Sequence, residues 1–300
     1  MEEADPERPA AEPKDGYVRT PNGNLHYLQW GGSGPRAHLL HANGFCAGTY
    51  APFVQYLIGN LHVFASDIRG HGGSDPPTHR RIRHWKTFAA DLKILTEAVL
   101  APPVVGIGHS LGAVTTYIAA ALYPHLFSAI VLIDPPILPV RKLWGLALLR
   151  FTGFGSCLPL ARGARRRQRV FSGKQEALQR FLSRRGIFQT WSPEFVQAYL
   201  ECGLLEKDGR TAVLRCDPEL EAQIFESIPI DVWRYASRIA CPVLALRGAA
   251  STTFLPQAAQ RLCRKIARCK LVTLPEAGHF APMEQPRACA QAIVDFVQRL

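Results

Sequence analysis

The chain has 300 residues, enough for one large domain or two small ones with a sizeable hydrophobic core. With 47% hydrophobic and 20% charged residues it has the composition of a soluble globular protein, and no uncharged apolar run is long enough to span a membrane. The formal net charge of +11 implies either well-solvated basic surfaces or an acidic partner.

Residues 1–15 are acidic, polar and rich in proline, the reverse of the basic and apolar layout of a signal peptide. We expect them to form a disordered tail. The eight cysteines include no C-x-x-C pair and no Cys/His cluster at zinc spacing. Together these features predict a cytoplasmic protein without disulfides.

Short apolar segments alternate with helical patterns along most of the chain. The expected strands are 17–20 and 25–30 (a hairpin with its turn at Asn22-Gly23), 37–41, 62–66, 104–108, 129–133, 242–247 and 270–274. The expected helices are 47–58, 84–100, 111–123, 256–266 and 286–300. This alternation predicts an α/β fold with a mostly parallel, doubly wound sheet that is covered on both faces.

One long segment interrupts the alternation. Residues 135–235 have a helical pattern with no clear strands, whereas 16–134 and 236–300 carry the strand–helix units. We therefore expect one α/β core formed by the two flanking segments, with 135–235 inserted as a helical cap. Sites in such sheets lie outside the carboxyl ends of the strands, and we expect the cap above that edge.

The segment 104–113 combines a short apolar strand, a turn with one serine and a helix of small residues. Gly108-His109-Ser110-Leu111-Gly112 fits the G-x-S-x-G pattern of a nucleophile elbow. A serine in such a tight strand-to-helix turn projects its hydroxyl into open space, and glycines on either side avoid collisions with the neighbouring backbone. The helix that follows favours an oxyanion at its N-terminus.

With three further motifs in order, the chain resembles the α/β-hydrolase superfamily, as a lid-containing serine esterase or lipase-like member, over residues 16–300. The four motifs are His41-Ala-Asn-Gly-Phe45, Asp67-Ile-Arg-Gly-His-Gly-Gly-Ser74, Gly108-His-Ser-Leu-Gly112 and Ala277-Gly-His-Phe280. The resemblance implies Ser110 as nucleophile, His279 as its base, and the backbone N–H groups of Phe45 and Leu111 as the oxyanion hole. It implies no metal and no organic cofactor.

The other motif residues are expected to have structural roles. His41 is interpreted as a packing residue or as a supporting group behind the site. Arg69 and His71 are interpreted as hydrogen-bonding residues of a loop that braces the site. His109, inside the elbow, is assigned no chemistry.

The acid of the triad is the departure from the family pattern. The family places it after the strand 242–247, but residues 248–255 contain no carboxylate and have threonine where aspartate is expected. The resemblance then favours Asp134, at the end of the neighbouring strand, over Glu276 and Asp231. The competing hypothesis is a broken triad in a protein that binds small molecules without catalysis.

With an intact triad, the predicted function is hydrolysis of carboxylic esters with apolar acyl or alkyl groups, through an acyl-enzyme on Ser110. A thioesterase or a carbon–carbon bond hydrolase of the same fold is the alternative, and a non-catalytic binder is the alternative of another class. Apolar cap residues, among them Trp144, Phe188 and Trp191, are candidates for the acyl pocket or for the cap's own packing. The sequence leaves the oligomeric state open.

Much of the positive charge lies in the run Arg162–Arg169. No aromatic residues interleave it and no nucleic-acid motif accompanies it, so nucleic acid is not expected as a partner. Two interpretations remain, a solvated helix face or a cationic rim that attracts anionic substrates or rests on an anionic membrane surface.

Overall fold

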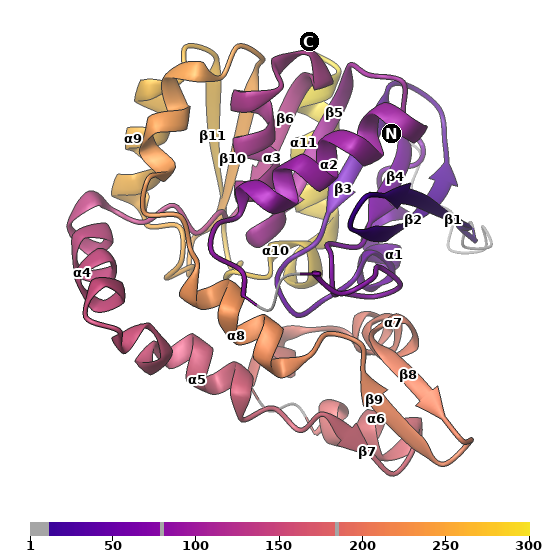
Figure 1. Cartoon of the computed structure of the whole chain (residues 1–300). Helices are drawn as coiled ribbons and strands as arrows, with labels where there is room; N and C mark the ends of the chain where they lie inside the picture. The colour runs from indigo at the N-terminus through magenta and orange to yellow at the C-terminus, as the bar shows by residue number, and fades with distance from the viewer. Residues whose placement is uncertain (1–11, 79–80, 184–185) are drawn as a thin grey trace.

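The computed structural model describes residues 12–78, 81–183 and 186–300 (Figure 1). Its largest element is an eight-stranded sheet. The strands are β1 (Lys14–Thr20), β2 (Gly23–Gly31), β3 (Arg36–Leu40), β4 (His62–Ser66), β5 (Val104–His109), β6 (Phe127–Ile133), β10 (Val243–Gly248) and β11 (Cys269–Leu274). Each strand expected in the core is present, with shifts of a few residues at the ends.

The strand order in this sheet is β1-β2-β4-β3-β5-β6-β10-β11. The β1–β2 hairpin and the β2–β4 pair are antiparallel. All other neighbours are parallel. The mostly parallel α/β architecture expected from the sequence is confirmed. The order places the ends of β5, β6, β10 and β11 side by side, so the loops that follow these four strands share one edge.

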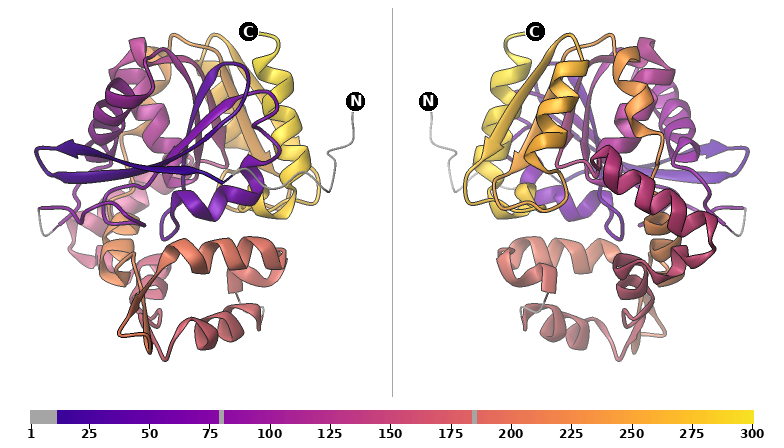
Figure 2. Two further views of the ribbon diagram at one scale, coloured as in Figure 1. Left: turned by 90° about the vertical axis from the view of Figure 1, so that its right-hand side faces the viewer. Right: turned by 90° about the vertical axis from the view of Figure 1, so that its left-hand side faces the viewer.

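Helices cover both faces of the sheet, as the side views in Figure 2 show. In the core they are α1 (Ala51–Val54), α2 (Lys86–Val99), α3 (Leu111–Leu122), α9 (Pro256–Lys265), α10 (Ala281–Glu284) and α11 (Pro286–Val297). Because strand side chains alternate, Ile130 and Leu132 of β6 pack with α2, α3 and α9, whereas Val131 and Ile133 pack with α1 and α11. Within the described ranges, no helix is long and apolar enough to cross a bilayer.

Residues 135–235 form a cap at the carboxyl end of the sheet, in the lower part of Figure 1. Its helices are α4 (Val140–Phe151), α5 (Pro159–Arg165), α6 (Lys174–Leu182), α7 (Pro193–Gly203) and α8 (Pro218–Glu226). The expectation of a cap without strands is wrong, because β7 (Val170–Phe171), β8 (Leu204–Lys207) and β9 (Thr211–Leu214) pair as a small antiparallel sheet. These strands have two to four residues, too few to show an alternating pattern.

Two boundaries differ from the sequence-based expectation. The strand β1 starts at Lys14, inside the expected tail, because Lys14 pairs with Gln29 and Asp15 with Leu28 of β2. Residues 1–11 of that tail lie outside the described residues. The expected helix 47–58 is shorter, a 3-10 turn at Ala47–Tyr50 followed by α1.

Four cysteines form disulfides, so the expectation of a chain without them is wrong. Cys46 pairs with Cys202 across 156 residues, and Cys263 pairs with Cys269 across six. Their Cα atoms are 6.7 and 4.9 Å apart, which is within reach of a disulfide. The Cys46–Cys202 pair joins the loop after β3 to α7 in the cap. The spacing of the cysteines in the sequence cannot reveal a pair between such distant segments.

Candidate active site

Ser110 occupies the turn between β5 and α3 with a backbone conformation that is rare for a side-chain-bearing residue, φ +54° and ψ −113°. The flanking glycines are required by space. A Cβ on Gly108 would lie 2.4 Å from the carbonyl oxygen of Gly112, and one on Gly112 would lie 2.1 Å from that of Leu40. The turn is fixed to the sheet by Ser110 N–H, which donates to Ile133 O at 2.9 Å. The local geometry is that of a nucleophile elbow.

Ser110, His279 and Asp134 lie in a hydrogen-bonded line, each on a loop that follows a different parallel strand. His279 Nδ1 donates to Asp134 Oδ2 at 2.7 Å, and Ser110 Oγ donates to His279 Nε2 at 3.0 Å. Because a carboxylate only accepts, it fixes the proton on Nδ1 and leaves Nε2 free to accept the serine proton. The structure thus brings together the three residues predicted to act in catalysis.

Asp134 is fully buried, and its carboxylate accepts hydrogen bonds from the loop after β10 as well. Ser251 Oγ donates to Oδ2 at 2.5 Å, and Gly248 N–H donates to Oδ1 at 3.3 Å. Thr253 N–H in turn donates to Ser251 Oγ at 3.1 Å. Asp134 N–H is held by Leu246 O at 2.8 Å, and the residue has φ +43°. The loop after β10, in which the resemblance led us to expect the acid, here supplies a supporting serine.

The two weaker candidates for the acid lie elsewhere. Glu276 is exposed on the loop after β11. Asp231 is paired with His84, at 3.0 Å, and with Arg234. Among the described residues, His279 has its carboxylate contact with Asp134 and none with these two.

The two predicted oxyanion donors differ in their present hydrogen bonds. Leu111 is the first residue of α3, so its N–H has no intrahelical partner. Phe45 N–H donates to Ala42 O at 3.2 Å, within a turn. Both residues line the same cavity as Ser110. One donor is therefore available at the helix N-terminus, and the other is engaged in a long hydrogen bond.

Two buried histidines hold the loop that contains Phe45. Ile68 N–H donates to His41 Nε2 at 2.8 Å, and His41 Nδ1 donates to Ala42 O at 2.7 Å. Gly44 N–H donates to His71 Nε2 at 3.1 Å. Burial lowers the pKa of His41 and lowers that of His71 to about 3, so both rings are neutral acceptors at pH 7. These contacts agree with the structural roles predicted for them.

His109 also has a bracing contact that the sequence did not reveal. Its Nε2 donates to the carbonyl of His279 at 2.8 Å, while Tyr50 OH donates to its Nδ1 at 2.6 Å. Tyr50 OH in turn accepts from Ala42 N–H at 3.0 Å. Burial lowers the pKa of His109 to about 3. A buried chain of neutral hydrogen bonds thus links the elbow, the loop of His279 and the loop of Phe45.

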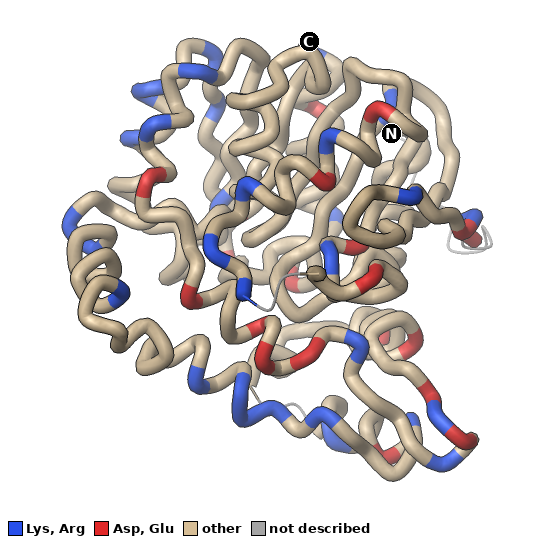
Figure 3. Tube along the Cα trace, viewed as in Figure 1, with Lys and Arg blue, Asp and Glu red and all other residues tan. Residues whose placement is uncertain are grey.

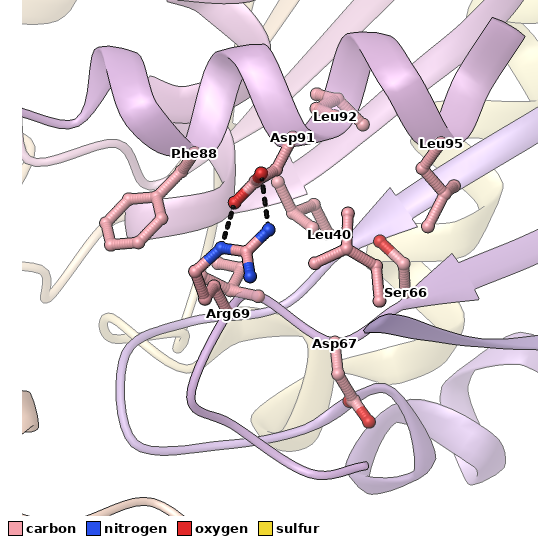
Figure 4. A pocket seen from close by; sticks show the side chains of 10 residues that line it. Leu40, Ser66, Asp67, Arg69, Phe88, Asp91, Leu92 and Leu95 are labelled. Carbon is pink, nitrogen blue, oxygen red and sulfur yellow. Dashed lines mark hydrogen bonds and ion pairs between the residues drawn. The ribbon is translucent and has the colours of Figure 1, made fainter. Parts of the chain in front are cut away.

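Arg69 anchors the loop after β4 to α2, as Figure 4 shows. Its guanidinium donates to both carboxylate oxygens of Asp91, each at 2.8 Å, and also to Asn22 O. The pair lies beside a small cavity of about 10 Å³. This bidentate contact supports the bracing role predicted for Arg69 and leaves it no part in substrate contact.

A cavity of about 600 Å³ extends from Ser110 and His279 between the core and the cap. Most of its wall is apolar. The larger apolar side chains are Phe45, Trp85, Leu160, Phe171, Phe181, Ile187, Phe188, Ile224, Phe225, Ile228 and Phe280. Its polar wall is basic, with Arg166, Arg167 and Arg180 against one carboxylate among the described residues, Glu221. A cavity of this size and lining fits a small organic molecule.

Of the three aromatic candidates for the pocket, only Phe188 lines it. Trp191 is buried behind the wall, with its ring 5.1 Å from that of Phe188 and 5.2 Å from that of Phe45. Trp144 is outside, with 74% of its surface exposed. The expectation for Trp144 is not met, because its side of α4 faces away from the neighbouring buried residues Leu143 and Leu146.

The basic run Arg162–Arg169 is divided between two surroundings. Arg165, Arg167 and Arg169 pair with carboxylates on or beside α8, among them Glu219, Glu221 and Asp217. Arg166 lines the cavity and, among the described residues, has no ion pair. Arg167 also lines the cavity, so the ion-paired and the cavity-lining members of the run overlap, and the sequence of the run alone does not separate them.

Within the described ranges, no group of three or more His, Cys, Asp or Glu side chains could hold a metal ion.

The sequence and the fold match known proteins. The family model of the alpha/beta hydrolase family matches residues 39–292. A 2-(acetamidomethylene)succinate hydrolase from Mesorhizobium japonicum is 25% identical over 272 residues, covering 89% of each chain. A crystal structure of E-2-(acetamidomethylene)succinate hydrolase superposes with a TM-score of 0.78 at 23% identity, covering 95% of this chain and 99% of the other. An esterase from Mycobacterium tuberculosis gives 0.73 at 21%, covering 96% and 92%. The chain belongs to the alpha/beta hydrolase family.

Proposed function

We propose that the protein is a serine hydrolase that cleaves carboxylic esters with apolar acyl or alkyl groups. The observation that carries the proposal is the hydrogen-bonded line of Ser110, His279 and Asp134, which opens into the largely apolar cavity. A serine hydroxyl is a weak nucleophile until a base removes its proton, and His279 Nε2 is 3.0 Å from Ser110 Oγ.

In the proposed mechanism, Ser110 Oγ attacks the ester carbonyl while its proton passes to His279 Nε2. Asp134 stabilises the imidazolium that forms, and the N–H groups of Leu111 and Phe45 donate to the oxyanion. His279 then protonates the leaving alkoxide, which gives an acyl-enzyme on Ser110. A water that transfers its proton to His279 hydrolyses this acyl-enzyme. The donor role of Phe45 requires its N–H to turn from Ala42 O, or to be shared with it.

Labelling with a fluorophosphonate tests the proposal directly. We expect one adduct at neutral pH, on Ser110, which disappears in Ser110→Ala and persists in Ser156→Ala, a matched change at an exposed serine of the cap. A series of p-nitrophenyl esters of increasing chain length then measures the acyl preference. An unlabelled wild-type protein that binds the esters without turnover would instead indicate a non-catalytic binder.

A second candidate substrate is an ester or thioester that carries an anionic group at its far end. It is favoured by the exposed arginines Arg166 and Arg180 in the cavity wall, and one relative is named for a succinate. The test of this candidate compares KM for an acyl-coenzyme A with KM for an uncharged thioester of the same acyl chain. The double change Arg166→Gln and Arg180→Gln should raise KM for the anionic substrate only. An equal effect on both substrates would exclude anion recognition by these side chains.

A further inference from the structure

The outer edge of the cap exposes an unusual set of large apolar side chains. Trp144, Leu148 and Phe151 on α4 are 74%, 64% and 90% exposed, and Phe154 and Leu160 are 59% and 60% exposed. We call these five residues the α4–α5 face. Single exposed apolar residues are common, but five large ones within 17 residues form a patch that indicates an interaction surface.

The helix geometry shows that this exposure belongs to one side of α4. Positions 144, 148 and 151 are four and three residues apart, so their side chains lie on one face of the helix. Leu143 and Leu146 point to the other side and are buried. The helix α4 therefore has two apolar faces, one packed against the protein and one that no described element covers.

The chain segment that carries the α4–α5 face has charged residues of one sign only. Residues 135–175 contain no Asp or Glu, and the tube in Figure 3 shows only basic positions along α4 and α5. The basic residues are Arg141, Lys142, Arg150, Arg162, Arg165, Arg166, Arg167, Arg169 and Lys174. Arg141, Lys142 and Arg162 are exposed and have no ion pair among the described residues. The carboxylates that pair with part of the run lie on α8, which packs against α5.

We propose that the α4–α5 face binds an anionic lipid surface. Exposed aromatic and aliphatic side chains flanked by lysine and arginine are the combination that inserts into the headgroup boundary of an anionic bilayer. A second copy of this chain fits less well, because the two like-charged faces would repel each other. A nucleic acid would leave the aliphatic side chains of Leu148 and Leu160 without a favourable contact.

The position of the α4–α5 face relates the proposed lipid contact to the cavity. Leu160 contributes to the α4–α5 face and also lines the cavity that contains Ser110. A docked cap would thus bring one wall of the cavity to the lipid surface, so an apolar substrate dissolved in the bilayer could reach it without crossing water. Binding itself does not rest on the proposed catalytic function, and Ser110→Ala should bind as the wild type does.

Flotation with vesicles tests the proposal. We expect the full chain to float with vesicles of phosphatidylglycerol and phosphatidylcholine and not with phosphatidylcholine alone, and salt should weaken the binding. Trp144 provides a local probe, because it is the most exposed of the five tryptophans: Trp30, Trp85 and Trp191 are buried, and Trp233 is half-buried. Its emission should shift to shorter wavelength on binding, and the shift should be absent in Trp144→Phe.

Variants separate the apolar and the charged contributions. The triple change Trp144→Ser, Leu148→Ser and Phe151→Ser should weaken the partition coefficient by roughly a hundredfold or more. Arg141→Gln with Lys142→Gln should weaken it about fivefold for each charge. The matched control is Tyr17→Ser with Leu205→Ser, which removes exposed apolar side chains away from the face and should change nothing. Far-ultraviolet circular dichroism checks that each variant is folded.

Three outcomes would overturn the proposal. One is vesicle binding that the triple variant retains, which would indicate binding through charge elsewhere. Another is equal binding to neutral and anionic vesicles. The third is a concentration-dependent dimer in sedimentation that the triple variant abolishes in the absence of vesicle binding, which would make the α4–α5 face an interface between two copies.

Discussion

The core and the cap differ in how tightly they are packed and in which side chains they bury. Around the elbow in the core, a single added methyl group would meet backbone at 2.1 Å, and the histidines 38, 41, 71 and 109 are fully or almost fully buried. The cap contains no histidine, and a methyl group added at Gly145 on α4 would meet nothing within 4 Å. The cap also exposes the large apolar side chains of the α4–α5 face.

This difference indicates that the core and the cap have different roles. The core holds Ser110, His279 and Asp134 at hydrogen-bond distances, which requires close packing and satisfied hydrogen bonds. The cap shapes the cavity and its approaches, which requires only that its inner surface be complementary to the substrate. Changes in the core should therefore affect rate and stability strongly, and changes in the cap weakly.

The largest expected effect is that of Asp134→Asn. The amide can no longer fix the useful tautomer of His279 or stabilise its positive charge, so kcat for a p-nitrophenyl ester should fall by about 10⁴. Asp208→Asn, at an exposed turn of the cap, is the matched control and should leave kcat unchanged. A loss smaller than about tenfold in Asp134→Asn would place the acid elsewhere.

The change Gly112→Ala should be the most costly for stability. The added Cβ would lie 2.1 Å from Leu40 O, a backbone atom that cannot move without disturbing β3. We expect the free energy of unfolding to fall by about 3 kcal/mol, measured by urea denaturation. Activity should fall as well, because the shift displaces Ser110. Wild-type stability in this variant would mean that the elbow tolerates more movement than the contacts suggest.

Acid should destabilise the core through its buried histidines. Burial lowers the pKa of His38, His71 and His109 to about 3, below the value near 6.5 of an unfolded chain. Each therefore binds a proton on unfolding below about pH 6.5, so its contribution to stability is present above that pH and is lost as the pH falls towards 3. The slope is up to about 1.4 kcal/mol per pH unit for each histidine.

The test of this pH dependence is urea denaturation between about pH 7.5 and 4.5, a range that brackets the unfolded-state pKa. In His38→Gln about one proton fewer should be taken up on unfolding, so the unfolding free energy should depend less steeply on pH. His125→Gln, at an exposed site, is the control for the loss of a histidine. An unchanged slope in His38→Gln would show that His38 is already protonated in the folded protein, or that unfolding does not expose it.

The smallest expected effect is that of Gly145→Ala in the cap. The position is helical and open, so the change removes backbone entropy from the unfolded chain without a collision. A gain of about 0.5 to 1 kcal/mol in unfolding free energy is expected, with unchanged kcat. Should the cap unfold separately from the core, a distinct early transition would move in this variant while the main one stays in place.

Local patterns predicted the core well, because the inner parallel strands are buried on both faces and so form continuous apolar runs, as Ile130, Val131 and Leu132 of β6 illustrate. The elbow was predicted for a similar reason, since its constraints lie within five consecutive residues. The carboxylate next to His279 depends on the order of β6, β10 and β11. The resemblance favoured Asp134 over Glu276 and Asp231, and the structure places Asp134 there.

The features that the sequence did not reveal depend on contacts between distant segments. Cys46 and Cys202 are paired across 156 residues. Ser251 supports Asp134 from another strand end. The three short strands of the cap are defined by their partners more than by their own residues. In each case the partner residue lies far away in the sequence, so no short stretch of sequence contains both partners.

The hydrogen-bond chain from Ala42 through Tyr50 and His109 to His279 has a consequence for how this protein could acquire new substrates. It joins three loops of the core to one another without using any residue of the cap. Substitutions in the cap that leave Cys202, the disulfide partner of Cys46, in place can therefore accumulate without altering this hydrogen-bond chain. Selection for a different substrate or a new surface would then act on residues 135–235 while the arrangement of Ser110, His279 and Asp134 is inherited unchanged.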